Sequence, residues 1–144
     1  MENDYMTHDI GKLLKLINDR LKTSFDASFK EKDLTLSQTR VLEFIHMRGN
    51  QTTQKEIEEY LEVSHPTVTG IISRLEKNGF LSCYFDPDDR RNKIVCNTEK
   101  ARMLNAFMAE EKNRMEHMMI VGLSETEIGE LFRMLQIIYG NIKQ

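Results

Sequence analysis

Hydroxyl, imidazole and guanidinium side chains are concentrated between residues 64 and 74. On a helix with 3.6 residues per turn, Val68, Ile71, Ile72 and Leu75 fall on one side and these polar side chains fall on the other. A small, polar helix face can enter the major groove of DNA, where hydroxyl and guanidinium groups form hydrogen bonds with base edges. The candidates for such contacts are His65, Pro66, Thr67, Thr69, Ser73 and Arg74, with Ser64 placed for a phosphate contact. The alternative is an ordinary amphipathic helix with a solvated outer face.

A second group of charged side chains follows between residues 86 and 93. Arg90, Arg91 and Lys93 lie at or next to a turn that also contains Asp86, Asp88 and Asp89. Long cationic side chains at the tip of a hairpin can reach the narrow minor groove of DNA. We predict that Asp89 orients Arg91 by an ion pair across the tip. The three aspartates also fit the alternative of a solvated, charged turn.

Two short helices in tandem would position the first group. Thr53 and Glu56 have the spacing of a capping box, in which each side chain satisfies a backbone N–H at a helix start. Ser64 is typical of a second N-cap, and Pro66 falls in the first turn behind it. These starts are eleven residues apart, which leaves room for one short helix and a tight turn. Asn78-Gly79 favours the end of the second helix, because both residues tolerate a left-handed conformation.

A β-hairpin would position the second group. Two β-prone runs, residues 80–85 and 93–96, flank the turn-rich segment. Residues 50–52 are interpreted as a short connection into the helix pair. The tandem helices and the hairpin together predict a mostly α fold with a small β-hairpin wing, a winged helix-turn-helix.

Long amphipathic helices are expected on both sides of this segment. Apolar positions recur at helical spacing over residues 5–29, a further helix begins at Leu36-Ser37, and Thr98 caps a long helix after the wing. Ser124 and Glu127 form the capping box of a final helix that runs to Gly140. The apolar stripes of the first and last helices would be costly to leave in water. Pairing them about a twofold axis predicts a homodimer with N- and C-terminal dimerisation helices, and a palindromic DNA site.

Several motifs resemble the MarR family of bacterial transcription regulators. They are the run Arg74-Leu-Glu-Lys-Asn-Gly-Phe-Leu, the tip Asp86-Pro-Asp-Asp-Arg-Arg and the segment Asn97-Thr-Glu-Lys. The family's wing carries an Asp-x-Arg motif with a Thr nine residues after the Asp, which Asp89, Arg91 and Thr98 match. Two positions depart from the pattern. Near Cys83 the family usually has a basic residue, and its absence weakens the expected phosphate contacts. At Asn97 the family usually has Leu, and this replacement is expected to loosen the packing of the wing.

The resemblance implies a single domain over residues 1–144, with a DNA-binding lobe at about 34–98 and dimerisation helices at about 5–29 and 99–140. It implies a transcriptional regulator, of repressor type, that binds double-stranded DNA as a homodimer. It also implies a cleft for a small, often aromatic effector that changes the spacing of the two recognition helices. Nine methionines, four of them between Met108 and Met119, could line such a cleft or simply fill the dimer core.

The composition limits the other functions. The net charge is −3, but residues 64–100 carry six Lys or Arg against five Asp or Glu, so this segment is nearly neutral. No apolar run approaches a membrane span and no signal peptide is recognisable, so a soluble, cytoplasmic protein without membrane contact is expected. The sequence contains no phosphate loop, nucleophile elbow or zinc-hydrolase signature. We therefore expect neither catalytic residues nor a cofactor.

Three alternatives concern binding or regulation. Cys83 and Cys96 are equidistant from a turn at Asp89-Arg90 and could face each other as a redox or metal pair, although nothing nearby lowers a thiol pKa. The four histidines are scattered, and only His117, near Glu110, Glu111 and Glu116, has potential metal ligands on its own helix; no metal site is predicted. A winged helix can also serve protein contacts without binding DNA.

Overall fold

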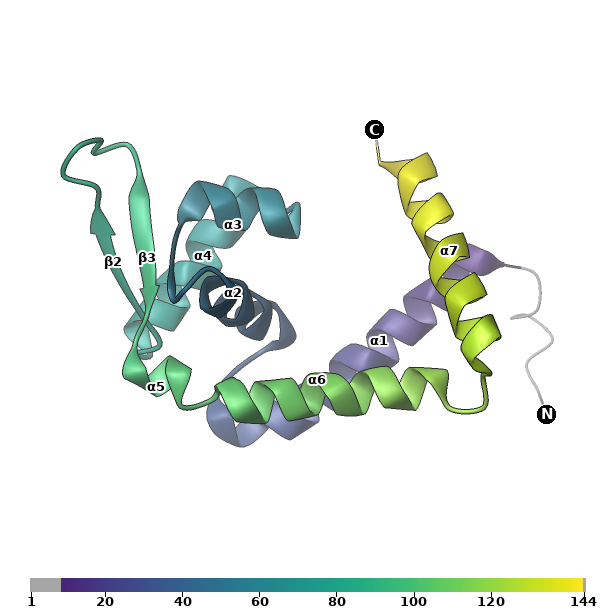
Figure 1. Cartoon of the computed structure of the whole chain (residues 1–144). Coiled ribbons are helices and arrows are strands. Elements are labelled where there is room, and N and C mark those ends of the chain that lie inside the picture. Colours follow the sequence, from purple (N-terminus) through teal and green to yellow (C-terminus); the bar gives the residue numbers. More distant parts are fainter. Residues whose placement is uncertain (1–8, 144) are drawn as a thin grey trace. The chain divides into compact units, whose positions relative to one another are not determined.

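The computed structural model describes residues 9–143, and the start of the first expected helix, at residues 5–8, lies outside this range together with His8. The elements are α1 (Ile10–Phe29), the 3-10 helix η2 (Lys30–Lys32), α2 (Leu36–Met47), β1 (Gln51–Thr53), α3 (Gln54–Leu61), α4 (His65–Lys77), β2 (Leu81–Phe85), β3 (Lys93–Asn97), α5 (Glu99–Arg102), α6 (Asn105–Ile120) and α7 (Glu125–Ile142). All except η2 and β1 are labelled in Figure 1. The chain divides into two compact units after Glu111, within α6, and each unit is described by itself.

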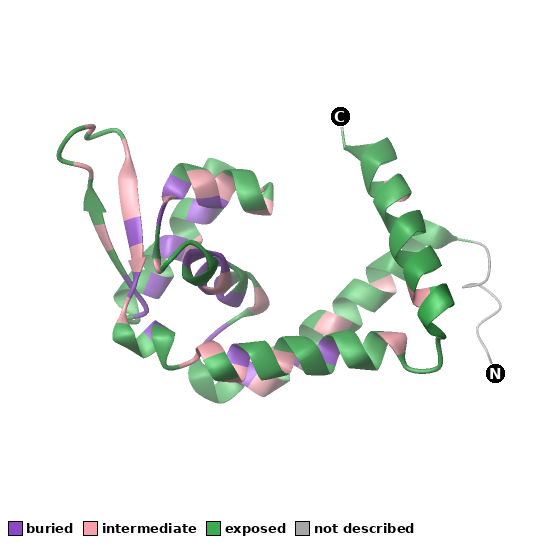
Figure 2. Ribbon diagram, in the orientation of Figure 1, coloured by how far each residue is buried: buried purple, intermediate pink, exposed green. Residues whose placement is uncertain are grey.

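The core of the first unit lies where α2, α3 and α4 pack together. Its fully buried side chains include Leu42 and Ile45 of α2, Ile57 of α3, and Ile72 and Leu75 of α4. Figure 2 shows that buried positions gather on these helices and at the base of the hairpin. The tandem helices are thus held by their apolar faces, which leaves the outer face of α4 free, as the 3.6-residue period predicts.

Two predicted caps have the right position but different partners. Thr53 Oγ1 accepts a hydrogen bond from Glu56 N at 3.1 Å, but the Glu56 carboxylate accepts from Arg48 and Thr52, each at 2.8 Å, instead of closing the capping box. Ser64 occupies the N-cap of α4 without a capping bond, and its hydroxyl donates instead to Thr67 Oγ1 at 2.9 Å. Nearby side chains therefore compete with the backbone for the capping groups.

Helix α2 begins at Leu36, as the sequence predicts. Its N-cap is Thr35, which exchanges hydrogen bonds with Gln38 in a complete capping box, and the helix ends at Met47. The predicted box at Ser124 and Glu127 is present at the start of α7. Gly79 follows α4 with φ +82°, as the predicted helix stop requires.

The sheet has three antiparallel strands in the order β1-β3-β2. Strand β1, residues 51–53, overlaps the segment 50–52 that was interpreted from the sequence as a connection, and it forms because its backbone groups pair with Ile94, Val95 and Cys96 of β3. Asn97, at the end of β3, is buried and donates from Nδ2 to the carbonyl of Leu42 at 3.1 Å. The departure at Asn97 therefore ties the base of the wing to α2, where the sequence suggested a looser wing.

Thr98 caps the helix after the wing, but that helix is interrupted. The Thr98 hydroxyl accepts from Ala101 N and donates toward Gly79 O at 2.6 Å, which ties the start of α5 to the turn between α4 and β2. Helix α5 ends at Arg102, and α6 starts at Asn105. The single long helix predicted from residue 98 is thus a short helix, a turn and a longer helix.

The first and last α-helices of the chain, α1 and α7, expose apolar side chains. In α1, Ile10, Leu13, Leu14 and Ile17 are exposed, whereas Phe25 and Phe29 are buried and stacked. In α7, no residue is buried, and Phe132 is 64% exposed (Figure 2). None of the described helices is both long and apolar enough to cross a membrane.

Candidate nucleic-acid interface

Helix α4 presents its predicted contact residues to solvent. The exposed set is Ser64, His65, Pro66, Thr67, Thr69, Ser73 and Arg74. Val68, Ile72 and Leu75 are buried on the opposite side. Ser64 donates to Thr67 Oγ1, so the Thr67 hydroxyl keeps its hydrogen for another acceptor. The outer face of α4 is therefore accessible, small and rich in hydrogen-bonding groups, as a surface that enters a groove requires.

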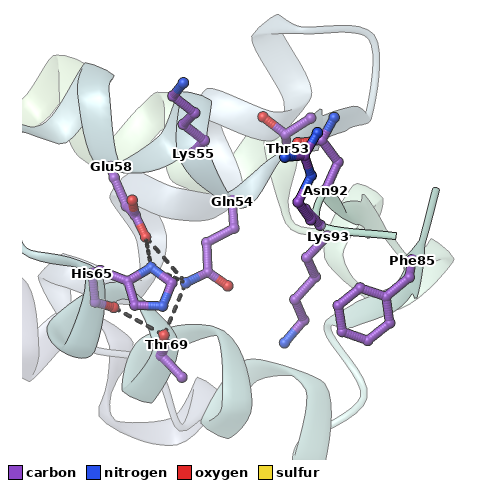
Figure 3. Close-up of a pocket in the computed structure, with 10 residues that line it drawn as sticks. Thr53, Gln54, Lys55, Glu58, His65, Thr69, Phe85, Asn92 and Lys93 are labelled. Carbon is purple, nitrogen blue, oxygen red and sulfur yellow. Dashed lines mark hydrogen bonds and ion pairs between the residues drawn. The ribbon is translucent and has the colours of Figure 1, made fainter. Parts of the chain in front are cut away.

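The N-terminal end of α4 is joined to α3 by a polar cluster (Figure 3). Gln54 lies only 6% exposed at the start of α3, and its Nε2 is 2.8 Å from Thr69 Oγ1 and 3.2 Å from Glu58 Oε1. Glu58 Oε1 also accepts from His65 Nδ1. The four side chains bridge the two helices of the tandem pair and fix the His65 ring from one side.

This cluster limits what Thr69 can offer to a ligand. Its hydroxyl donates to the His65 carbonyl at 2.9 Å and accepts from Gln54. The hydroxyl hydrogen is used inside the protein, so Thr69 cannot donate to a ligand, and its methyl is available for an apolar contact. A threonine methyl packs on the C5-methyl group of thymine in the major groove.

The wing tip is built by backbone and carboxylate hydrogen bonds. Asp89 Oδ1 accepts from both the backbone N and the side-chain Nε of Arg91, each at 3.1 Å. Asn92 N donates to the Asp89 carbonyl at 2.9 Å, and Asp86 N donates to the Asn92 carbonyl at 2.9 Å. The predicted ion pair between Asp89 and Arg91 is present, and the Arg91 side chain is 91% exposed. Asp89 thus orients the Arg91 guanidinium, which remains accessible to solvent.

A cleft of about 510 Å³ lies between the helix pair and the wing. Figure 3 shows the cluster of Gln54, Glu58, His65 and Thr69 on one side and Phe85 and Lys93 of the hairpin on the other. The cleft is also lined by Thr53, Lys55, Arg91 and Asn92. His65, Thr69, Arg91 and Lys93, four of the predicted contact residues, therefore meet around one space.

The other predicted residues lie apart from this cleft. Ser73 and Arg74 are farther along α4 and do not line it, and Arg90 lines a second space of about 410 Å³ with Phe85, Asp86 and Pro87. Sequence reasoning missed Gln54, Lys55, Glu58, Phe85 and Asn92. The spacing of Gln54 and Glu58, one helical turn apart, was a usable signal for a shared helix face. Their partners on α4 depend on the packing of two helices, which no local pattern specifies.

The two cysteines do not face each other. The strand register pairs Cys83 with Val95 and Ser82 with Cys96, one residue away from the equidistant turn assumed from the sequence. A shift of one residue places the two thiols on opposite faces of the sheet. Burial, together with the Glu76 carboxylate, raises the pKa of Cys83 to about 12, and burial raises the pKa of Cys96. The register thus contradicts the alternative in which the two cysteines face each other as a redox or metal pair, and it agrees with two separate strand thiols.

We expect Cys83 to be poorly reactive in the folded protein. At pH 8, iodoacetamide should modify it at least about tenfold more slowly than in the urea-unfolded chain, because alkylation requires the thiolate. Because the pKa of Cys83 is higher in the folded protein, the unfolded chain releases the thiol proton at a lower pH than the folded protein does. The free energy of unfolding should therefore fall as the pH rises above the ordinary thiol pKa of 9.0. Mass spectrometry of timed samples measures the rate. Equal rates in both states would contradict the pKa shift.

The candidate metal ligands on α6 do not converge. Within residues 9–143, no group of three His, Cys, Asp or Glu side chains could hold an ion. This range includes Glu110, Glu111, Glu116 and His117 of α6.

Three comparisons bear on this interface. The model of the MarR family matches residues 32–92, from the end of η2 to the tip of the wing. The uncharacterized HTH-type transcriptional regulator YwoH of Bacillus subtilis (strain 168) is 35% identical over 99 residues, which cover 69% of this chain and 68% of that protein. The name of this relative, an HTH-type regulator, agrees with the helix pair described above.

Solved structures with the same fold include regulators bound to DNA. A putative MarR family transcriptional regulator from Listeria monocytogenes, complexed with a 26mer DNA, has a TM-score of 0.83 at 26% identity and covers 94% of this chain and 90% of its own. BpsR of Bordetella bronchiseptica, studied for regulation of its DNA binding by 6-hydroxynicotinic acid, has a TM-score of 0.82 at 24% identity, with 93% and 95% covered. The mostly helical fold with a small antiparallel wing is thus confirmed.

Proposed function

Because this chain belongs to the MarR family of DNA-binding transcriptional regulators, we propose that its α4 surface and wing form the DNA interface. Helix α4 enters the major groove, and the wing brings Arg90 and Arg91 to the adjacent minor groove. The observation that carries this assignment is the pairing of an exposed, polar α4 face with an Arg91 side chain that Asp89 orients while leaving it 91% exposed. The family consists of regulators, in agreement with the expectation of a protein without catalytic residues.

Lys55 and Lys93 extend the proposed interface to the phosphates. Both line the cleft between the helix pair and the wing, beside His65 and Arg91. Each phosphate that a lysine neutralises releases counterions from the DNA, which strengthens binding at low salt. Lys55 offers a cation that the sequence argument did not include. This cation partly replaces the phosphate contact that is expected to be lost because Cys83 stands where a basic residue is usual.

A homodimer would supply the second copy of this interface. The exposed apolar side chains of α1 and α7 support it, because a soluble chain rarely leaves such stripes in water. A twofold axis would place two recognition helices about one DNA turn apart, ~34 Å, and would require a palindromic operator. We propose that the protein is a repressor and that it acts in the bacterial cytoplasm, where its operator lies.

A small effector would act on this dimer by shifting its conformational equilibrium. The regulation of BpsR by 6-hydroxynicotinic acid supports an aromatic effector for this chain as well. Such a molecule releases DNA only if it binds the DNA-incompetent conformation more tightly than the competent one. Met118 and Met119 are exposed and could contribute to its site. Neither of the two clefts near the wing contains a methionine.

Selection of bound duplexes from a random pool tests the proposed function. We expect enrichment of a palindrome whose half-sites are about one helical turn apart, and a logarithm of affinity that falls steeply and linearly with the logarithm of salt concentration. A pool without enrichment and without salt-dependent binding would reject DNA recognition and favour a winged helix that contacts proteins. Enrichment of a single, asymmetric half-site would reject the dimer.

A further inference from the structure

The hydrogen bonds between α3 and α4 determine where the hydrogens lie on the side chains of Gln54, Glu58, His65 and Thr69. A carboxylate only accepts hydrogen bonds, so in the contact between Glu58 and His65 the hydrogen resides on Nδ1 of the ring. Gln54 Nε2 has two hydrogens, and its acceptors at 2.8 Å and 3.2 Å are Thr69 Oγ1 and Glu58 Oε1. Its 3.3 Å approach to His65 Nδ1 is then a contact between two donors and not a hydrogen bond. Every hydrogen in the cluster has one acceptor.

The consequence concerns the opposite nitrogen of the His65 ring. A neutral imidazole that carries its hydrogen on Nδ1 has a lone pair on Nε2 and is a hydrogen-bond acceptor there. The His65 side chain is 72% exposed, whereas that of Glu58 is only 20% exposed. The carboxylate therefore holds the ring from the protein side, and Nε2 is the polar atom that His65 offers to a ligand on the outer face of α4.

We propose that Glu58, held in place by Gln54, is a specificity-determining positioning residue that fixes His65 as an acceptor for DNA bases. In the major groove, the donors are the N6 amino group of adenine and the N4 amino group of cytosine. His65 accordingly selects adenine or cytosine at one position of each half-site, and it disfavours guanine and thymine there because they offer acceptors at the corresponding edge. Glu58 does not touch the DNA. This inference rests on the proposed placement of α4 in the major groove.

Nitrogen-15 NMR of the imidazole rings tests the proton assignment without any DNA. In the free protein at pH 8, we expect the His65 signals of a neutral ring with a protonated Nδ1 and a bare Nε2. In Glu58→Ala, the two tautomers should mix, because the carboxylate that selects one of them is gone. Glu59→Ala removes an exposed carboxylate from the same helix and should leave the His65 signals unchanged. A cationic ring, or a ring protonated on Nε2, in the wild-type protein overturns the proposal.

Duplex selection with the same variants tests the base preference. We expect His65→Ala and Glu58→Ala to lose discrimination at the same operator position, by about threefold to tenfold, while the rest of the operator sequence is retained. Glu58→Gln keeps an oxygen acceptor for Nδ1–H and should restore part of the preference. Glu59→Ala should select the wild-type operator. Circular dichroism of each variant verifies that the fold is intact.

The two measurements separate failure of this inference from failure of the proposed function. If the wild-type protein selects no duplex, DNA recognition fails, while the ring signals still report the tautomer. If the wild-type protein selects an operator but His65→Ala keeps every preference, or Glu58→Ala loses discrimination at a different position, the positioning role of Glu58 is overturned.

Discussion

Replacing Phe132 with Glu in α7 should yield a monomer that binds the operator at least about a hundredfold more weakly than the wild-type protein. Phe132 is 64% exposed and shares the apolar stripe of α7 with Leu131, Leu135 and Tyr139. A buried carboxylate without a partner is costly, so the variant should not form the proposed interface. Two linked half-site contacts gain about 10²–10⁴ in avidity over one, which a monomer forfeits. Light scattering after size-exclusion chromatography measures the mass, and fluorescence anisotropy measures the affinity.

The matched control adds the same charge elsewhere on α7. Thr126 is exposed and lies on the side of the helix away from the stripe by the 3.6-residue period. Thr126→Glu should therefore remain dimeric and bind DNA as the wild-type protein does, apart from a small effect of its charge. A dimeric Phe132→Glu variant with full affinity would show that the α7 stripe is not the interface.

Replacing Arg91 with Ala should weaken operator binding by at least about tenfold without a measurable loss of stability. Each arginine contact to DNA contributes roughly 1–3 kcal/mol, and the proposed dimer carries two wings. The side chain is 91% exposed, and its hydrogen bond and ion pair are made to Asp89, so little packing is lost. Anisotropy titrations at several salt concentrations measure the affinity and its salt dependence, and thermal unfolding measures the stability.

Two further variants separate the role of Arg91 from that of net charge and of tip geometry. Lys12→Ala removes one positive charge from an exposed position of α1 and should leave operator affinity nearly unchanged. Asp89→Asn weakens the ion pair but keeps an acceptor for the Arg91 backbone N–H, so its effect should be smaller than that of Arg91→Ala. Full affinity of Arg91→Ala would remove the wing from the interface.

The elements were predictable wherever the decisive interactions are local. Gly79 ends α4, Thr98 caps α5, and Ser124 with Glu127 caps α7, each within a few residues of its partner. The apolar period of α4 identified both its buried side and its exposed side. These signals, with the motif of Asp89, Arg91 and Thr98, were sufficient to identify the fold class and the MarR family, and the comparisons confirmed both. The individual DNA contacts remain predictions.

The errors arose where a group had more than one partner within reach. Glu56 could cap α3 or bind Arg48, and Ser64 could cap α4 or bind Thr67. Only the folded arrangement decides between such competing hydrogen-bond partners. Strand β1 exists because β3 passes beside it, although its sequence alone reads as a loop. The break between α5 and α6 was also not indicated by the apolar period.

By itself, the sequence determined the tandem helices, the two hairpin strands, the outer face of α4 and the charged wing tip, because helix period, capping and turn chemistry act over only a few residues. Tertiary structure decided the strand register, which separates Cys83 from Cys96, and the approach of α3 to α4, which joins Gln54 and Glu58 to His65. Both depend on atoms that are distant in the chain and become neighbours only when the apolar faces pack. A one-residue change of register or a small rotation of α3 would alter these contacts while leaving the local sequence signals the same.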